Sequence, residues 1–309
     1  MIIQYQILRN SMTSNLRILI IGKVKFTESI LNELITKGFK ISGVICGENK
    51  GINSDFVDLS LIAKKNNISF HSTDDINSGP TLAWAKEKKP DVIFCLGWPQ
   101  LIKKELLSLP KKYIIGYHPS DLPFNKGRHP IIWSLVLGLS RTASCFFLMD
   151  EGADTGQVIS KKFIAITKKD KAADLYFKIE SAAKKQIIKI IKDISHDKLK
   201  PLKFDTDQGN SWRKRSENDG LIDWRMTAES IYNLVRALSH PYEGAHFLFD
   251  SKPYKVYDSE ISPKVSERNI EPGKINSIKN GSVEIQCGKG SIILKKIEPS
   301  IDLTGKEYL

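Results

Sequence analysis

A histidine at the end of an apolar run is the first feature of this sequence that could do chemistry. Residues 114–118 read IIGYH, and the following loop, PSDLPFNKGRHP, holds prolines, a glycine and charged side chains. An apolar, β-branched run that ends in a polar loop is typical of the carboxyl end of a buried strand. Ligands bind at such ends in open α/β sheets, so His118 lies where a reactive group is expected.

A carboxylate 36 positions later is a candidate partner for this histidine. Asp154 lies in the glycine-flanked turn MDEGADTGQ (149–157), between two apolar runs. A histidine and a carboxylate at the ends of different strands can meet at one sheet edge, where the carboxylate fixes the imidazole tautomer and raises its basicity for proton transfer. The alternative is that Asp154 is an ordinary turn residue and His118 a loop histidine with satisfied hydrogen bonds.

Strand and helix patterns alternate through the first two hundred residues. A lysine-rich helical segment closes this region and places five apolar residues on one stripe. The alternation predicts an α/β fold with a doubly wound, mostly parallel sheet. The clearest strand patterns are LRILIIG (16–22), ISGVIC (41–46), PDVIFCLGWPQLI (90–102) and YIIGYH (113–118), and the helical stripe consists of Leu175, Ile179, Ala183, Ile187 and Ile191.

The last ninety residues or so have a different pattern. One helical segment, AESIYNLVRALS, precedes short apolar runs separated by glycine and asparagine, which predicts a small β-rich, OB-like barrel. We therefore expect an N-terminal extension at 1–15, an α/β domain at 16–203, a linker at 204–220 and a carboxyl-terminal domain at 221–309. Met12 is a second candidate start, just before the first strand.

Composition excludes several classes of protein. The longest apolar run, IIWSLVLGL (131–139), is about half of the roughly 20 residues that span a bilayer. The first residues lack the pattern of a secretory signal, so the cytoplasm is the expected compartment. There is no dinucleotide or phosphate-loop fingerprint and no metal-ligand spacing, so no metal is expected. The scattered cysteines predict reduced core thiols: Cys46, Cys95, Cys145 and Cys287.

The net charge of +12 raises nucleic acid as a partner, but the charge is unevenly distributed. From residue 205 to the end there are 15 Lys+Arg and 16 Asp+Glu, so the whole surplus lies in the first 204 residues. Residues 160–204 alone hold 13 lysines against 5 acids. These lysines fall largely opposite the apolar stripe, which favours a solvated helix face over a surface that attracts phosphate.

Three motifs in order resemble the folate-dependent formyltransferases. HPSDLPFNKG is similar to the family's H-x-S-L-L-P-x-x-R-G, and MDEGADTG matches at the right separation. KRSENDGLIDWRMTAESIYNLVRALSHPYEGAHF resembles the segment that opens the family's carboxyl-terminal domain, and PGKI with GSVEIQCGKGSIIL resembles its closing barrel. The resemblance covers nearly the whole chain and implies an N10-formyltetrahydrofolate donor and a primary amine acceptor.

The resemblance also assigns the reactive set. In the family an asparagine, a histidine and an aspartate are catalytic, which carries over to His118 and Asp154, but Gly116 stands where the asparagine is expected. The missing amide would stabilise the oxyanion, and losing such a donor costs on the order of 10²–10³ in rate. Asn125 in the same loop could supply an amide from another direction, and otherwise protonated His118 acts without one.

The family's pterin pocket maps onto two loops of this chain. Backbone groups of Leu96, Trp98 and Gln100, in FCLGWPQLI, would bind the hydrogen-bonding edge of the ring, while Asp150 and Gly152 would line its other side. Plain core packing is the alternative for Trp98.

Two classes of acceptor fit the resemblance. The tRNA-modifying members bind RNA through a basic loop after the second strand and a basic carboxyl-terminal domain. Here the loop CGENKGINSDFVDLS is short and near neutral, and the tail lacks the positive charge that dominates RNA binding. A nucleotide-linked amino sugar is therefore favoured over initiator tRNA. The candidate substrate-binding residues are Ser120, Asn125, Lys126 and Arg128.

Other interpretations stay open from the sequence. Lys126 takes the place of the family's arginine, a point charge where the family has a bidentate fork, and both Lys126 and Arg128 could be solvated loop charges. The absence of the asparagine is also compatible with a folate-binding protein without transferase activity, or with a folate hydrolase. The sugar-modifying members commonly pair, which is compatible with a homodimer. The sequence does not identify the sugar or the nucleotide.

Overall fold

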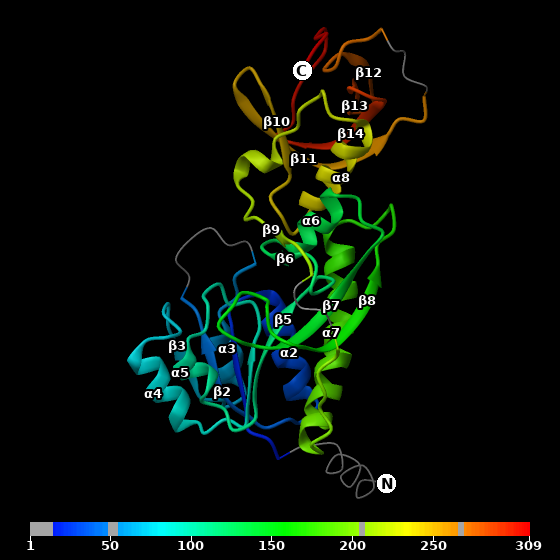
Figure 1. Ribbon diagram of the computed structural model, residues 1–309. Coiled ribbons are helices and arrows are strands. Elements are labelled where there is room, and N and C mark those ends of the chain that lie inside the picture. Colours follow the sequence, from blue (N-terminus) through cyan, green and yellow to red (C-terminus); the bar gives the residue numbers. More distant parts are fainter. Residues whose placement is uncertain (1–14, 49–54, 204–207, 265–268) are drawn as a thin grey trace, which may run out of the picture. The chain divides into compact units, whose positions relative to one another are not determined.

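The structure is a computed structural model that describes residues 15–48, 55–203, 208–264 and 269–309 (Figure 1). The expected extension at 1–15 and Met12 therefore lie almost entirely outside the described residues, as does part of the loop after the second strand. The chain divides into two compact units. One consists of Met1–Gly127, Ala143–Ile164 and Lys178–Ser211, and the other of Arg128–Thr142, Ala165–Phe177 and Trp212–Leu309.

The first sheet has seven strands in the order β3-β2-β1-β4-β5-β7-β8. Strands β1 to β5 are parallel, and β7 is antiparallel to β5. The expected doubly wound, mostly parallel sheet is confirmed. The bounds are β1 (Ile18–Gly22), β2 (Ile41–Cys46), β3 (Phe70–Ser72), β4 (Val92–Cys95), β5 (Tyr113–His118), β7 (Arg141–Leu148) and β8 (Val158–Ala165).

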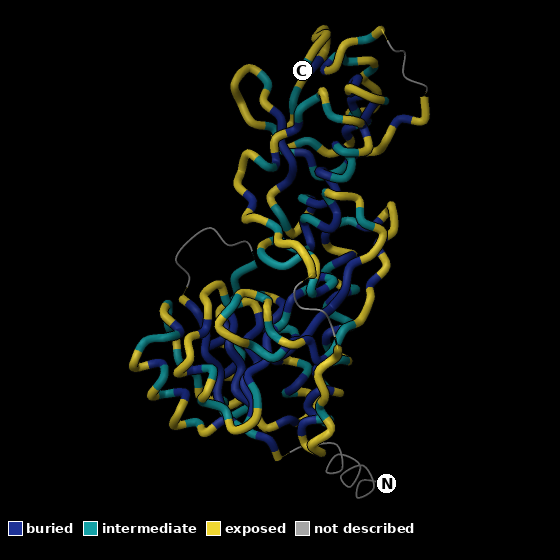
Figure 2. The backbone as a smooth tube through the Cα atoms, in the orientation of Figure 1, coloured by how far each residue is buried: buried dark blue, intermediate teal, exposed yellow. Residues whose placement is uncertain are grey.

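Apolar side chains bury the middle of this sheet on both faces. Every residue of β1 and β4 is buried, as Figure 2 shows in dark blue, because helices connect the parallel strands and cover the sheet. The four cysteines are buried and free, and burial raises the pKa of the Cys95 and Cys145 thiols to about 12. The helices of this unit are α2 (Lys25–Thr36), α3 (Leu59–Lys65), α4 (Gly79–Glu87) and α5 (Lys104–Leu107). Helix α6 (Pro130–Val136) belongs to the second unit, and α7 (Ala172–Ser195) has its first residues in the second unit and the rest in the first.

The order of the strands reverses between β1 and β4, where the chain approaches itself closely. A Cβ atom on Gly22, at the end of β1, would lie 2.3 Å from the carbonyl oxygen of Leu96, which follows β4. Only glycine allows this approach, because any side chain would collide with the backbone. The two loops therefore meet at the switch point of the sheet, where ligands bind in folds of this class.

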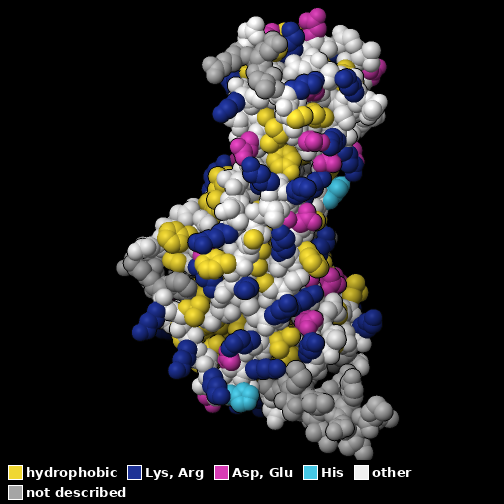
Figure 3. All heavy atoms as spheres, turned by 90° about the vertical axis from the view of Figure 1, so that its right-hand side faces the viewer, with side chains coloured by type: hydrophobic (Ala, Val, Ile, Leu, Met, Phe, Trp, Pro, Cys, Tyr) yellow, Lys and Arg dark blue, Asp and Glu magenta, His cyan; other side chains and the backbone are white. Residues whose placement is uncertain are grey.

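The long helix α7 buries the stripe that its periodicity predicts. Leu175, Ala183, Ile187 and Ile191 have no exposed surface, and Ile179 is 2% exposed. On the solvent side, Lys184 pairs with Glu180 and Lys189 with Asp193, each one helical turn apart. Figure 3 shows Lys and Arg side chains scattered over the visible face, with Asp and Glu among them. This arrangement agrees with a solvated helix face.

The second sheet has five antiparallel strands in the order β10-β11-β14-β13-β12. Helix α8 (Ala228–Leu238) begins at Thr227, whose side chain accepts a hydrogen bond from the Ser230 N–H, and it buries Ile231, Leu234 and Val235 in the core of this unit. The strands are β10 (Ala245–Phe249), β11 (Lys252–Ile261), β12 (Ile275–Lys279), β13 (Ser282–Gln286) and β14 (Ser291–Glu298), and shorter elements are β6 (Lys126–Gly127), β9 (Ser211–Trp212) and the 3-10 helix η1 (Glu217–Gly220).

None of the helices in the described part of the chain is both long and apolar enough to cross a membrane.

Truncating the buried stripe of α7 will destabilise the fold. Ile187 is fully buried, so we expect Ile187→Ala to lower the free energy of unfolding by about 2–5 kcal/mol through lost transfer energy and the cavity left behind. The exposed Lys185 on the same helix is the control, and Lys185→Ala should change stability by no more than about 0.5 kcal/mol. Urea unfolding followed by circular dichroism measures both, and equal midpoints would contradict the packing described.

Candidate active site

His118 is the last residue of β5, and its ring is held from two sides. The residue is only 5% exposed. Its Nδ1 lies 3.5 Å from Asp154 Oδ2, and its Nε2 lies 3.0 Å from the carbonyl oxygen of Asn125. Both neighbours accept hydrogen bonds, so only the doubly protonated imidazolium can donate to both at once. The ring is therefore fixed between a carboxylate and a backbone carbonyl.

Asp154 occupies the turn between β7 and β8 and is fixed by the same loop that contacts His118. Its φ of 57° lies in the left-handed region, which aspartate tolerates better than most residues. The backbone N–H of Gly127 donates to Asp154 Oδ2 at 3.1 Å, the same oxygen that faces His118. The sequence predicts that these two residues meet at one sheet edge, and the structure brings them together there.

The loop after His118, residues 119–127, which we call the catalytic loop for its proposed role, is held by a residue that the sequence does not single out. Asn210 accepts a hydrogen bond from the Asn125 N–H on its side-chain oxygen (2.9 Å) and one from the Lys126 N–H on its carbonyl (3.0 Å). These bonds stabilise Asn125 in a left-handed conformation with a φ of 64°. Asn210 lies in the polar stretch taken as a linker, and nothing in its sequence neighbourhood indicates the contact.

The same loop is anchored to β8 by Lys161. The Lys161 ammonium donates to the Leu122 carbonyl at 2.7 Å and pairs with Asp121, and both charged side chains are mostly buried. The Ser120 hydroxyl donates to the Phe124 carbonyl at 3.1 Å, and Ser120 has no exposed surface. In this conformation Ser120 shapes the loop from inside, so its expected contact with a substrate stays a prediction.

Gly116 faces an aromatic ring. It pairs across the sheet with Phe147 of β7, which is 3% exposed. A Cβ atom on Gly116 would lie 2.6 Å from Phe147 Cζ and 3.0 Å from Met149 Cγ. The position therefore has no space for an amide side chain while Phe147 is present, which gives the physical reason why glycine stands there.

The loop after β4 is tied to its neighbours through its own polar groups. The Leu96 N–H donates to the Ile21 carbonyl at 2.8 Å, and the Leu96 carbonyl accepts from the Thr27 hydroxyl at 2.5 Å. The expected binding of a ring edge by Leu96 is thus limited to the second lone pair of its carbonyl. Trp98 is half-buried and packs against the core of the sheet, in agreement with the packing role that is the alternative to ring binding.

Gln100 uses its side chain to connect this loop to the segment before α4. Its Oε1 accepts from Trp98 Nε1 at 3.1 Å and from the Ile76 N–H at 3.0 Å, and its Nε2 donates to the Asp74 carbonyl at 2.9 Å. The amide therefore fixes the shape of the loop, and any role in binding a ligand falls to its backbone.

The turn that carries Asp154 is organised by Asp150. Asp150 Oδ1 accepts from the Gly152 N–H at 3.0 Å and from the Thr155 hydroxyl at 2.6 Å. A Cβ atom on Gly152 would lie 2.1 Å from Thr155 Oγ1, so glycine is needed for this closed turn. Asp150 and Gly152 thus give the turn its shape.

Arg128 belongs to the second compact unit and is exposed there. Its backbone N–H donates to the Trp212 carbonyl at 3.1 Å. Within the same unit its charge contributes, with Arg215 and Lys214, to a lowered pKa of His129, whose largest cause is burial. The sequence groups Arg128 with the catalytic loop, and the structure assigns it to the unit that follows.

The comparison with known families identifies the class of protein to which this chain belongs. The chain belongs to the formyl transferase family: the model "Formyl transferase" matches residues 15–191, and "Formyl transferase, C-terminal domain" matches residues 214–309. The protein is a formyltransferase.

Methionyl-tRNA formyltransferases and sugar N-formyltransferases are among the proteins that this chain resembles. Methionyl-tRNA formyltransferase of Clostridium acetobutylicum is 28% identical over 288 residues, which cover 92% of each chain. An N-formyltransferase from Helicobacter canadensis, solved with folinic acid and dTDP-3-aminofucose, is 21% identical with a TM-score of 0.71, covering 91% of this chain and 99% of that one. The sugar 3N-formyl transferase WlaRD, solved with dTDP and 5-N-formyl-THF, is 22% identical with a TM-score of 0.69, covering 93% and 99%. At these identities the two solved structures establish the fold alone.

Adding a methyl group at position 116 will overpack the sheet. We expect Gly116→Ala to lower the free energy of unfolding by about 1–3 kcal/mol, because the new Cβ meets the Phe147 ring. Combining it with Phe147→Leu should cost less than the two single changes added together, since the smaller side chain yields space. Chemical unfolding of the two single variants and the double variant measures this coupling, and strictly additive losses would show that the contact is absent.

Proposed function

We propose that the protein transfers a formyl group from N10-formyltetrahydrofolate to the primary amine of a nucleotide-linked amino sugar, with His118 and Asp154 as the catalytic pair. The observation that carries the proposal is the contact of His118 with two acceptors, the Asp154 carboxylate at 3.5 Å and the Asn125 carbonyl at 3.0 Å. A protonated ring in this position can stabilise a developing oxyanion.

The chemistry follows from the balance of bonds. The donor supplies an activated formyl group. A new N–C bond forms between the acceptor amine and the formyl carbon, the bond from that carbon to N10 breaks, and the amine proton is transferred so that N10 leaves protonated. Asp154 orients His118 and stabilises its protonated form, and His118 helps to remove the proton from the attacking amine, directly or through a water.

Stabilisation of the oxyanion is the step for which this chain has an unusual arrangement. Gly116 cannot supply an amide, and its space is filled by Phe147. Asn125 is the candidate replacement, because its backbone is already bonded to His118 Nε2 and its conformation is fixed by Asn210. We propose that protonated His118 carries most of this stabilisation, with Asn125 as the nearby amide.

For the donor, the loops that meet at the β1/β4 switch point are the proposed pterin site. Leu96, Trp98 and Gln100 come from the loop after β4, while Asp150 and Gly152 come from the turn that also carries Asp154. The donor's reactive end would then lie next to the catalytic pair. The bound folates in the solved sugar N-formyltransferases of the same fold support a folate ligand.

For the acceptor, charge favours an amino sugar on a nucleotide. The region from residue 205 to the end holds 15 basic and 16 acidic residues, so it lacks the positive charge with which proteins attract RNA phosphates. Lys126, on the catalytic loop, is the proposed contact for the acceptor's phosphates or hydroxyls, and Arg128 is a second candidate. Both lysine and arginine bind phosphate, the former as a point charge.

Initiator methionyl-tRNA is the second candidate acceptor. The observation that favours it is the similarity to methionyl-tRNA formyltransferase of Clostridium acetobutylicum, which is 28% identical over nearly the whole chain. A folate-binding protein without transferase activity is the third candidate. It is supported by Gly116, which stands where the family has a catalytic asparagine.

Loss of either member of the pair will abolish most of the activity. We expect His118→Ala and Asp154→Asn each to lower kcat by at least about 100-fold, because proton transfer and its orientation are lost while the fold persists. Glu151→Gln, an exposed change in the same turn as Asp154, is the control and should stay near wild type. The assay measures the rate at which tetrahydrofolate forms. Near-wild-type transfer by His118→Ala would refute the assignment.

A panel of acceptors will identify the substrate class. We expect the protein, given 10-formyltetrahydrofolate, to add a formyl group to a nucleotide-linked amino sugar and to leave charged initiator tRNA unchanged, because the chain lacks a basic tail for RNA. Product mass distinguishes the outcomes. Formylation of tRNA alone would replace our choice with the second candidate, and folate binding without any formylated product would favour the third.

A further inference from the structure

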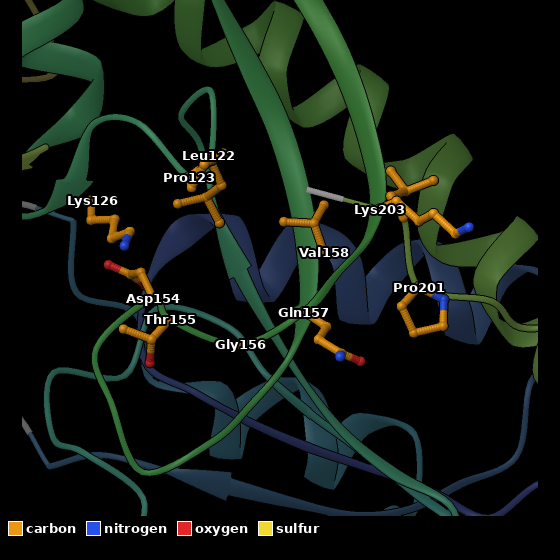
Figure 4. Close-up of a pocket in the computed structure, with 11 residues that line it drawn as sticks. Leu122, Pro123, Lys126, Asp154, Thr155, Gly156, Gln157, Val158, Pro201 and Lys203 are labelled. Carbon is orange, nitrogen blue, oxygen red and sulfur yellow. The ribbon is translucent and has the colours of Figure 1, made fainter. Parts of the chain in front are cut away.

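A cavity of about 380 Å³ opens beside Asp154, one member of the proposed catalytic pair, within the first compact unit (Figure 4). Asp154 and Lys126 lie together at one end of it, and Pro201 and Lys203 lie at the other. The volume falls in the range of small-molecule sites, which begins at about 300 Å³. Leu96, Trp98 and Gln100, in the loop after β4, are not among the residues that line it.

The walls of the cavity are fixed by backbone contacts. The Leu202 N–H donates to the Val158 carbonyl at 2.7 Å, which holds the far wall against the start of β8. The Lys161 ammonium donates a hydrogen bond to the Leu122 carbonyl at 2.7 Å and so holds Leu122 in place. A Cβ atom on Gly156 would lie 1.6 Å from the Leu148 carbonyl oxygen, so the turn packs directly on the end of β7. The space is therefore already formed before a ligand arrives.

The chemistry of the lining indicates an anionic ligand with an apolar part. Leu122, Val158 and Leu202 supply apolar wall, and Lys126 and Lys203 supply positive charge near the two ends. Neither lysine forms an ion pair with any residue that the structure describes. Asp154 is the one acid in the lining, and its Oδ2 is engaged by Gly127 and His118.

We propose that this cavity is a ligand subsite in which Lys203 binds an anionic group that is attached to a ring or other apolar portion. Lys203 lies at the end away from Asp154, so the ligand's reacting end would be at the catalytic pair and its charge at Lys203. Two ligands of the proposed function share this chemistry: the folate donor, through its glutamate carboxylates, and the acceptor, through its phosphates. The choice between these ligands rests on the proposed function, whereas the subsite itself rests on the cavity.

Binding measurements on a lysine variant test the subsite. We expect Lys203→Met to weaken binding of one of two probes, 5-formyltetrahydrofolate or dTDP, by about tenfold, the effect of losing a charged hydrogen-bond donor. Lys200→Met is the matched control, because Lys200 is exposed, lies three residues earlier and does not line the cavity. Isothermal titration calorimetry on the full chain gives both dissociation constants, and circular dichroism verifies that each variant is folded.

The outcomes separate the two sources. Weaker binding of the folate alone assigns the cavity to the donor's carboxylates, and weaker binding of dTDP alone assigns it to the acceptor's phosphates. The proposal is overturned if a folded Lys203→Met binds both probes within twofold of wild type, if Lys200→Met has the same effect, or if the wild type binds neither probe. Because these measurements need no turnover, they can succeed where formyl transfer fails and can fail where transfer succeeds.

Discussion

The site depends on one imidazole held between two hydrogen-bond acceptors. The carboxylate of Asp154 and the carbonyl of Asn125 both face the ring of His118. A neutral imidazole has one N–H and can donate to only one of these acceptors, whereas the imidazolium has two and can donate to both. The arrangement requires that both acceptors be held in place, since a small displacement would let either one accept a hydrogen bond from water instead of from the ring. The contacts that hold the surrounding loops therefore serve the chemistry.

The rigidity of the catalytic loop comes from polar contacts that reach it from far along the chain. Asn210 bonds to its backbone, and Lys161 enters from β8 with an ion pair that is largely withdrawn from solvent. Gly209 approaches so closely that a Cβ atom there would lie 2.2 Å from the Pro123 carbonyl. A loop with a left-handed asparagine next to a reactive residue costs conformational energy, which such external contacts must offset. The polar stretch after the long helix thus takes part in building the site.

Much of the fold follows from local patterns in the sequence. The strands are β-branched and apolar because they are buried on both faces, and the stripe of α7 repeats with helical spacing, so both could be predicted. His118 and Asp154 could be paired because each follows an apolar run, and strand ends converge at one edge. Asn210 and Lys161 could not, because they reach the loop through contacts 85 and 39 residues apart that leave no periodic trace. The hydrogen bond from the Leu96 N–H to the Ile21 carbonyl could not be predicted from the sequence either.

The pairing of Gly116 with Phe147 constrains how this sequence can change over time. Glycine at position 116 fits the phenylalanine at position 147. An asparagine at 116 would collide with that ring, and a smaller residue at 147 would leave space beside the glycine. A lineage that gained an asparagine at position 116 first would pass through an overcrowded sheet, and one that lost the ring first would pass through a hollow one. Both intermediates are less stable than either end point. The side chain at position 147 therefore limits which residues position 116 can hold, so the effects of changes at the two positions should depend on each other.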